Sequence, residues 1–179
     1  DNSNASADLT ITTLAAVSGG NDGIYARNLG TGVLTVTANA NVTGGSGSGI
    51  DTRTSSGMST VITLNSGAMV SSTTGSAIFN NTGDSTTTVN AGAGVTGAIS
   101  LGGGSDALTF DGGSFAGVTF FDGGDGAVDT LTFTNVTGTV TGADIANFES
   151  VAIGAGASIG FSDNTLTTET LSVTDGGKL

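Results

Sequence analysis

Apolar and polar residues alternate along most of this chain, in short segments separated by glycine-rich stretches. Successive side chains of a β-strand point to opposite faces, so this alternation predicts short strands with one buried face. β-branched residues fill the segments, and the apolar spacing of an amphipathic helix is nearly absent. The inward residues fall in eight segments: Leu9/Ile11 with Val17, Leu34/Val36 with Val42, Ile62/Leu64 with Val70, Thr87/Val89 with Val95, Leu108/Phe110 with Phe115, Leu131/Phe133 with Val140, Val151/Ile153 with Ile159, and Leu171/Val173 with Leu179.

The eight segments recur at steps of 20 to 28 residues. A strip of two or three inward residues cannot bury itself, but stacked coils pair their strands in parallel and align the apolar residues in columns. The sequence therefore predicts an all-β fold, a right-handed parallel β-helix, which is a three-sided solenoid of about eight coils of ~20–28 residues. A further inward column is predicted for Ile24, Ile50, Ile78, Leu101, Val118, Ile145 and Leu166.

Glycine supports this interpretation, because the 32 glycines lie largely between the strand segments, where corners require positive φ. Pairs such as Gly19-Gly20 and Gly44-Gly45 are predicted to form such corners. A β-sandwich would show turn signals every ~8–12 residues, whereas this pattern recurs at the length of a coil. A flexible Gly/Ser linker would lack apolar motifs in register.

Residues 1–179 are predicted to form one β-helix segment in which the type of coil changes. Residues 1–97 are rich in Ser, Thr and Asn and have longer coils, whereas residues 98–179 are richer in Asp and Phe and have shorter coils. Phe110 and Phe133 occupy equivalent inward positions, which predicts that their rings stack along the core. Because the first and last residues fall inside the repeat, we expect the chain to be a piece of a longer protein, with adhesive open edges.

The chain carries 15 acidic and only 3 basic residues, which gives a net charge of −12. Nucleic-acid binding requires a basic surface, and anionic membranes repel an acidic chain, so neither partner is expected. No apolar run approaches the ~18 residues of a membrane span. Histidine and cysteine are absent, which excludes the Ser–His–Asp and Cys–His arrangements of nucleophilic catalysis. We therefore expect a non-catalytic protein with no cofactor.

Aspartates cluster in the second half, and their carboxylates are the candidates for acid–base chemistry or metal binding. Segments 102–108 and 123–129 partly resemble the calcium-binding nonapeptide repeats of RTX proteins, whose ions lie between tandem copies. Asp106 and Asp129 stand 23 residues apart, so we expect them to stack in successive coils and to accept backbone hydrogen bonds at turns. No catalytic or metal site is therefore assigned to the cluster, which comprises Asp106, Asp111, Asp122, Asp125 and Asp129.

Threonine dominates the positions that flank the inward residues and point to solvent. A flat threonine array resembles the ice-facing wall of some ice-binding solenoids, but threonine also suits exposed β positions and pairs with threonine on a neighbouring strand. Tyr25, the one tyrosine, follows inward Ile24 and is predicted to be exposed. The outward pairs, which other residues interrupt, are Thr10/Thr12, Thr35/Thr37, Thr63/Asn65, Thr88/Asn90, Thr109/Asp111, Thr132/Thr134, Ala152/Gly154 and Ser172/Thr174.

Four segments of the second half carry a resemblance to a known family: Gly103-Gly104-Ser105-Asp106-Ala107-Leu108-Thr109-Phe110, Asp122-Gly123-Gly124-Asp125-Gly126, Asp129-Thr130-Leu131-Thr132-Phe133 and Gly142-Ala143-Asp144-Ile145-Ala146-Asn147-Phe148-Glu149. Together with the alternating Val151 and Ile153, they resemble the coils of passenger regions in monomeric autotransporters. These are the type V secreted proteins of Gram-negative bacteria. The resemblance covers about residues 99–179.

The resemblance implies a right-handed β-helix that is exported through a C-terminal outer-membrane barrel, which lies outside this chain. It also implies display at the cell surface and roles in adhesion or virulence. The expected partners are host surface or matrix molecules, or further copies of the protein. We therefore expect a non-catalytic stalk or adhesive surface. The alternatives are a segment of a carbohydrate-active β-helix enzyme and an ice- or calcium-binding solenoid.

Overall fold

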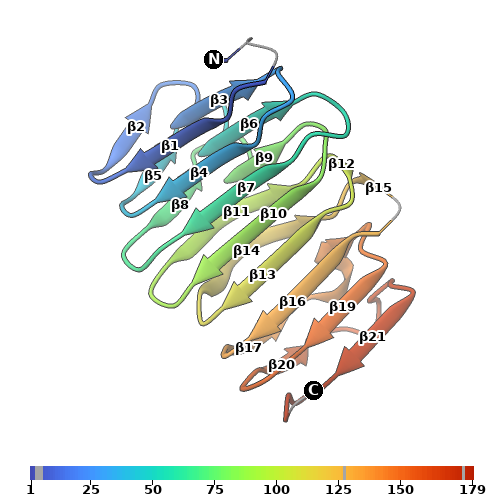
Figure 1. Ribbon diagram of the computed structural model, residues 1–179. Coiled ribbons are helices and arrows are strands. Elements are labelled where there is room, and N and C mark those ends of the chain that lie inside the picture. The colour runs from blue at the N-terminus through green and yellow to red at the C-terminus, as the bar shows by residue number, and fades with distance from the viewer. Residues whose placement is uncertain (3–5, 127, 175) are drawn as a thin grey trace.

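The chain folds into a parallel β-helix, as the sequence predicts. The computed structural model describes residues 1–2, 6–126, 128–174 and 176–179. Every ladder between strands in these ranges is parallel, and the chain makes about seven right-handed turns (Figure 1). Each turn brings the chain back one strand further along the axis, so the apolar face of each coil is covered by its neighbours.

The first wall of the solenoid is a sheet of eight strands, whose order follows the chain from the first coil to the last. In the strands between the first and the last of this sheet, alternate residues are buried, which confirms the predicted period of two. The strands are β1 (Leu9–Thr13), β4 (Leu34–Ala38), β7 (Thr60–Leu64), β10 (Ser85–Asn90), β13 (Ala107–Asp111), β16 (Thr130–Thr134), β19 (Ser150–Ile153) and β21 (Thr170–Val173).

Two further walls complete the triangle. The second begins with β2 (Val17–Gly19), β5 (Val42–Gly44) and β8 (Met69–Ser72), and ends with β17 (Thr137–Val140) paired to β20 (Ser158–Phe161). The third contains β3 (Ile24–Asn28), β6 (Ile50–Thr54), β9 (Ile78–Asn80) and β18 (Ile145–Ala146). The short strands β12 (Gly103–Gly104) and β15 (Asp125–Gly126) pair apart from these walls, and η1 (Gly142–Asp144) is a single 3-10 turn.

The change of coil length has a structural cause. Strand β11 (Gly94–Ser100) pairs with β8 at its start and with β9 near its end, so it passes through the second and third walls without a loop. Strand β14 (Ser114–Asp122) follows it along both walls. Paired residues on the first wall are 25, 26 and 25 positions apart in the early coils, and 21, 23, 20 and 20 apart afterwards.

The predicted alignment of the first wall was wrong at one step. Val36 stands opposite Ile62, and Leu34 opposite the buried Thr60, so the third coil lies two residues from its predicted register. A shift of two keeps every side chain on its predicted face, which is why alternation alone did not reveal it. The prediction aligned Leu34 with Ile62 because it used apolar residues alone, and the inward residue opposite Leu34 is a threonine.

The other inward columns also differ from prediction in the second half of the chain. Ile99 pairs with Ile78, and Phe121 with Ile99, so these residues take the places predicted for Leu101 and Val118. On the second wall, Ile159 lies opposite Gly138 and not opposite Val140. The bulges where β11 and β14 pass the corner shift the register, and a fixed spacing cannot anticipate them.

Phenylalanine rings fill the core of the middle coils. Phe110 and Phe133 are buried and stacked, with ring centroids 5.9 Å apart and planes 16° apart, which confirms the prediction. Phe115 and Phe121 meet them edge-on. The Phe115 ring occupies the space beside Gly138, where a Cβ atom would lie 2.5 Å from the ring. Large and small inward residues therefore complement one another between neighbouring coils.

Glycine serves the corners in two ways. Gly102 and Gly124 adopt φ values of 82° and 98°, as predicted for corner glycines. Gly44 does not have positive φ, and the prediction for the Gly44-Gly45 pair was wrong on this point. A Cβ atom at Gly44 would lie 2.1 Å from the carbonyl oxygen of Ser48, so the close approach of two backbone segments requires glycine there.

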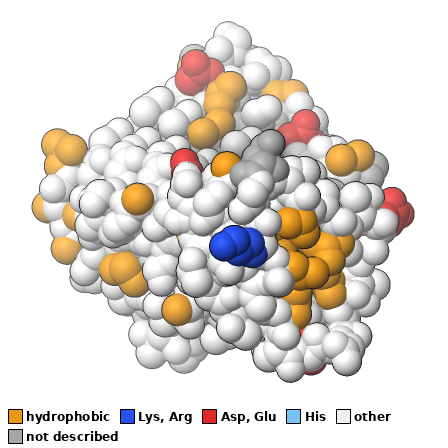
Figure 2. Space-filling view, turned by 90° about the horizontal axis from the view of Figure 1, so that it is seen from below, with side chains coloured by type: hydrophobic (Ala, Val, Ile, Leu, Met, Phe, Trp, Pro, Cys, Tyr) orange, Lys and Arg blue, Asp and Glu red, His pale blue; other side chains and the backbone are white. Residues whose placement is uncertain are grey.

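The lower end of the solenoid exposes residues that are buried in the other coils. Leu171 and Val173 continue the inward columns of the first wall, yet 41% and 44% of their surfaces are exposed. Figure 2, which views the molecule from below, shows hydrophobic side chains gathered on this end. No helix within the described residues is long and apolar enough to cross a membrane.

Candidate functional site

Threonines form a continuous outward column on the first wall. The two-residue register correction places Thr63 beside Thr37, and Asn65 no longer interrupts the array. Threonine is continuous in this column over the first six coils, whereas Val61 and Ala107 interrupt the neighbouring outward column, so the ladder is interrupted as predicted but at other residues. The column consists of Thr12, Thr37, Thr63, Thr88, Thr109 and Thr132, and continues as Ala152 and Ser172.

Asparagines form a second column at the corner that follows the first wall. The Asn65 side-chain amide donates to Oδ1 of Asn39 at 2.9 Å, and the Asn90 amide donates to Oδ1 of Asn65 at 3.0 Å. Further along the solenoid, the Asn135 amide donates to Oδ1 of Asp111 at 2.7 Å. These bonds join successive coils outside the backbone ladder, so the outward asparagines have a structural role.

A ladder of acidic side chains lies at the opposite end of the first-wall strands. The backbone N–H of Ser85 donates to Oδ1 of Asp106 at 2.6 Å, and the N–H of Asp106 donates to Oδ1 of Asp129 at 2.7 Å. The N–H of Asp129 donates to Oε2 of Glu149 at 2.6 Å. The predicted stacking of Asp106 on Asp129, with backbone donors at the turn, is confirmed.

Both aspartates of this acid ladder are buried, which the sequence did not indicate. Asp106 is 2% exposed and Asp129 is 0% exposed, and Oδ2 of each has no hydrogen-bond partner among the described residues. Burial, together with the nearby charges of Asp106 and Glu149, raises the pKa of Asp129 to about 6, against the lowering effect of the hydrogen bond from the Asp106 N–H. Burial also raises the pKa of Asp106, against the effect of its hydrogen bonds from Ser85.

The other aspartates of the second half lie apart from this ladder. Asp111 and Asp125 are exposed, on β13 and β15. Asp122 ends β14 and accepts hydrogen bonds from the Gly124 N–H and the Asn147 amide, as expected for a residue at a turn. No group of three or more acidic side chains in the described ranges is placed to hold a metal ion. Ala127, in the second RTX-like segment, lies outside the described residues.

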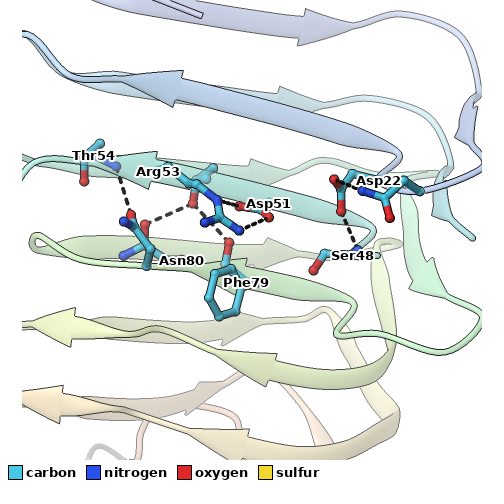
Figure 3. A network of polar contacts seen from close by, with 10 residues as sticks. Asp22, Ser48, Asp51, Arg53, Thr54, Phe79 and Asn80 are labelled. Carbon is cyan, nitrogen blue, oxygen red and sulfur yellow. Dashed lines mark hydrogen bonds and ion pairs between the residues drawn. The ribbon is translucent and has the colours of Figure 1, made fainter. Parts of the chain in front are cut away.

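The outer face of the third wall holds an aromatic and charged cluster of Tyr25, Asp51, Arg53 and Phe79, which we call the Arg53 cluster. Figure 3 shows Asp51, Arg53 and Phe79 of this cluster from close by. Tyr25, Asp51 and Phe79 stand opposite one another on β3, β6 and β9. Arg53 follows Asp51 by two residues, so both side chains lie on the same face of β6. The exposed Tyr25 ring, at 49%, confirms the prediction for this residue.

A bidentate ion pair holds Arg53 in place. Its Nε and Nη2 donate to the two carboxylate oxygens of Asp51 at 3.0 and 2.8 Å, and these bonds raise the pKa of Arg53. The guanidinium carbon also lies 5.6 Å from the ring centroids of Tyr25 and Phe79. Arg53 is therefore fixed by one carboxylate and two aromatic rings.

Polar groups from the loops between the second and third walls form the rim of a shallow depression beside this cluster. Asp22 accepts the backbone N–H of Ser48 at 2.7 Å through Oδ1 and the Asn21 amide at 2.8 Å through Oδ2 (Figure 3). The next two coils have no such loops, since β11 and β14 pass the same corner as continuous strands. The depression is thus specific to the first part of the solenoid.

The sequence analysis missed the Arg53 cluster apart from Tyr25. The available signal was the Asp51-Thr52-Arg53 spacing, which puts opposite charges on one face of a strand. The two flanking rings were not detectable, because their positions depend on the register of three coils.

The fold and these surfaces define the class of protein: a parallel β-solenoid whose outer walls carry polar residue columns and one aromatic, charged cluster. Comparisons of the chain with protein-family models, with curated proteins and with solved structures found no match in any of the three.

Proposed function

We propose that this chain is a non-catalytic, surface-displayed segment that serves as a stalk and an adhesive surface, as in autotransporter passengers. Its partners in this proposal are host-cell or matrix molecules, or further copies of the protein. Support comes from the segments 103–110, 122–126, 129–133 and 142–149, which resemble passenger coils and lie in register on the solenoid. Glu149 and Asp129 of these segments are joined in the acid ladder.

The observation that carries the proposal is the continuity of the outer columns. Six successive coils present threonine at one position of the first wall, and asparagine amides join the coils beside them. Backbone ladders fix every coil to the next, and the asparagine amides add links among the second, third and fourth coils, so the solenoid is stiff along its axis. A stiff rod with a hydroxyl-rich wall suits projection from a surface and contact with another polar surface.

Surface display is tested on cells that produce the full-length protein. Antibodies against the purified chain should label intact cells as strongly as permeabilised cells, and added protease should remove the label. An antibody against a cytosolic protein should label only the permeabilised cells. Labelling that appears only after permeabilisation would contradict surface display.

Adhesion is tested separately with beads that carry the purified chain. These beads should clump, or bind to matrix-coated plates and cell monolayers, more than albumin-coated beads do. Aspartate at both Thr63 and Thr109 should weaken contact made through the first wall, because it adds negative charge to an acidic molecule. The adhesive role would be excluded if beads that carry the chain neither clumped nor bound to any surface more than albumin-coated beads do.

Ice binding is a second candidate, because the register correction makes the threonine array more regular than predicted. Thr10/Thr12, Thr35/Thr37, Thr86/Thr88 and Thr130/Thr132 present two outward threonines per coil, while Val61 and Ala107 replace the first threonine in two coils. Regular hydroxyl and methyl groups on a flat wall can order water in a lattice.

Thermal hysteresis of the purified chain at millimolar concentration tests this candidate. If the first wall binds ice, Thr63→Tyr should remove most of the hysteresis, whereas Thr43→Tyr, on the exposed face of the second wall, should not. Absence of hysteresis in the unaltered chain would exclude ice binding.

A further inference from the structure

The Arg53 cluster departs from the hydroxyl-rich pattern of the outer walls. Asp51 points outward on β6 but is only 5% exposed, because the Arg53 side chain covers it. Removing the Asp51 carboxylate from water is costly, and Arg53, whose side chain remains 41% exposed, offsets that cost without adding much net stability compared with uncharged residues. A threonine at either position would satisfy the fold, so the pair marks this place as a candidate for recognition.

We propose that the Arg53 cluster is a binding subsite for a neutral, hydroxyl-rich glycan. This inference rests on the proposed adhesive role and supplies the class of partner for it. The site lies on the third wall, so it is distinct from the threonine column of the first wall.

The aromatic rings supply apolar surface for the C–H face of a sugar ring. Tyr25 is half-exposed and Phe79 partly exposed, and the two side chains stand two coils apart on β3 and β9. At the usual strand spacing this separates them by about 10 Å along the axis. Tyrosine offers a rigid apolar face and a hydroxyl group with little loss of side-chain entropy on binding.

Fixed polar groups between and beside the rings supply hydrogen bonds. Nε and Nη2 of Arg53 are used by Asp51, which leaves Nη1 to donate to a ligand hydroxyl. Asn21, exposed on the rim, adds an amide that can both donate and accept. Because Arg53 is already held by Asp51 and two rings, it loses little freedom when it binds.

The local charge favours a neutral ligand. Arg53 is balanced by Asp51, and Asp22 adds a further negative charge on the rim. A sulfated or phosphorylated ligand would meet these carboxylates, and a cationic ligand would meet the guanidinium. A neutral sugar can use donors and acceptors together without bringing a charge into the depression.

The test uses the purified chain on a printed panel of neutral oligosaccharides built from hexoses, fucose and N-acetylhexosamines, with sulfated oligosaccharides printed beside them. Retained oligosaccharides are then titrated calorimetrically. We expect at least one to bind, and Tyr25→Ala to weaken it at least tenfold, because the half-exposed ring provides contact area. Arg53→Met should have a similar effect. Thr139→Ala, at an exposed position of β17 on the second wall, is the matched control and should bind as the unaltered chain does.

Thermal melts of all variants separate binding from folding, and Tyr25→Ala keeps the test valid if Arg53→Met fails to fold. Failure to bind any neutral oligosaccharide at millimolar concentration would overturn the proposal. Unchanged affinity of Tyr25→Ala, or binding of sulfated glycans alone, would also overturn it. These results leave the surface-labelling experiment unaffected, so failure of this site and failure of the display proposal are distinguishable.

Discussion

Single inward side chains determine how well each coil packs on the next. Phe133 stacks on Phe110 and meets Phe115 and Phe121 edge-on, so it joins side chains from three walls. The absence of a side chain at Gly138 makes room for Phe115. These contacts place the largest apolar residues where the loops between the second and third walls have disappeared.

Replacement of Phe133 by alanine should destabilise the chain by about 3–5 kcal/mol, because it removes a fully buried ring and leaves a cavity between coils. Phe120→Ala is the control, because Phe120 is 37% exposed on the outer face of β14. Its replacement should lower the free energy of unfolding much less. Urea unfolding followed by circular dichroism measures both changes. Equal midpoints for Phe133→Ala and the unaltered chain would contradict the placement of Phe133 in the core.

The buried carboxyl of Asp129 should make stability depend on pH in an uncommon direction. Its pKa is about 6 in the folded chain, against 3.8 for an unperturbed aspartate, so folding favours the neutral form. Well below pH 3.8 the carboxyl is protonated in both states and no penalty arises. The penalty builds up between pH 3.8 and about 6, where the unfolded chain ionises while the folded carboxyl stays neutral, and it levels off above pH 6 at no more than about 3 kcal/mol.

The Asp129→Asn variant isolates this effect, since its amide oxygen can still accept the Asp106 N–H. We expect it to be more stable than the unaltered chain at pH 7.5, with the difference shrinking toward pH 4. Asp125→Asn, at an exposed position, should show no such trend. Melting curves at several pH values measure the difference, and a gap that widened on acidification would refute the assignment.

Strands in this solenoid are held by more than their backbone ladders. Asn65 links the corners of three coils, because it donates to Asn39 and accepts from Asn90. The acid ladder performs a similar task at the other end of the same strands, with side-chain acceptors for backbone N–H groups. The two ladders fix the axial register of the first wall at both of its edges.

Replacement of Asn65 by alanine should therefore lower stability by about 1–3 kcal/mol, because it removes two hydrogen bonds between coils. Amide exchange should accelerate most at the corners of the second to fourth coils. Asn164→Ala, at an exposed position, is the control. If exchange at the corner residues were unchanged in Asn65→Ala, the ladder would have no role in fixing the coils.

The molecule as a whole has an apolar lower end (Figure 2). Leu171, Val173 and Leu179 are exposed there, beside the free edge of β21. Exposed parallel edges and apolar column ends favour association with another β-structure. This surface is distinct from the Arg53 cluster, which lies in the first three coils.

The purified chain should therefore self-associate as its concentration rises. Sedimentation velocity from micromolar to millimolar concentration should show an average mass that rises with concentration. Leu171→Lys should make this rise smaller, because it places a charge in the apolar end. Val128→Lys, at a position that is 58% exposed and away from this end, is the control. A chain that stayed monomeric over the whole range would refute association through the lower end.

The sequence by itself determined the class of fold, the inward face of the first-wall strands and the stacking of Phe110 on Phe133. These features follow from alternation and coil length, which are local properties of the chain. Exposure of Tyr25 and the stacking of Asp106 on Asp129 were predictable on the same grounds.

Only the tertiary structure decided the register between coils. A coil can shift by two residues and keep its faces, so the inward Thr60, the unbroken threonine column and the place of Ile99 were not accessible to pattern analysis. The Arg53 cluster depends on this register, because Tyr25, Asp51 and Phe79 meet only when three coils with different loops align. Burial of Asp129 likewise results from packing against neighbouring coils, which no local pattern records.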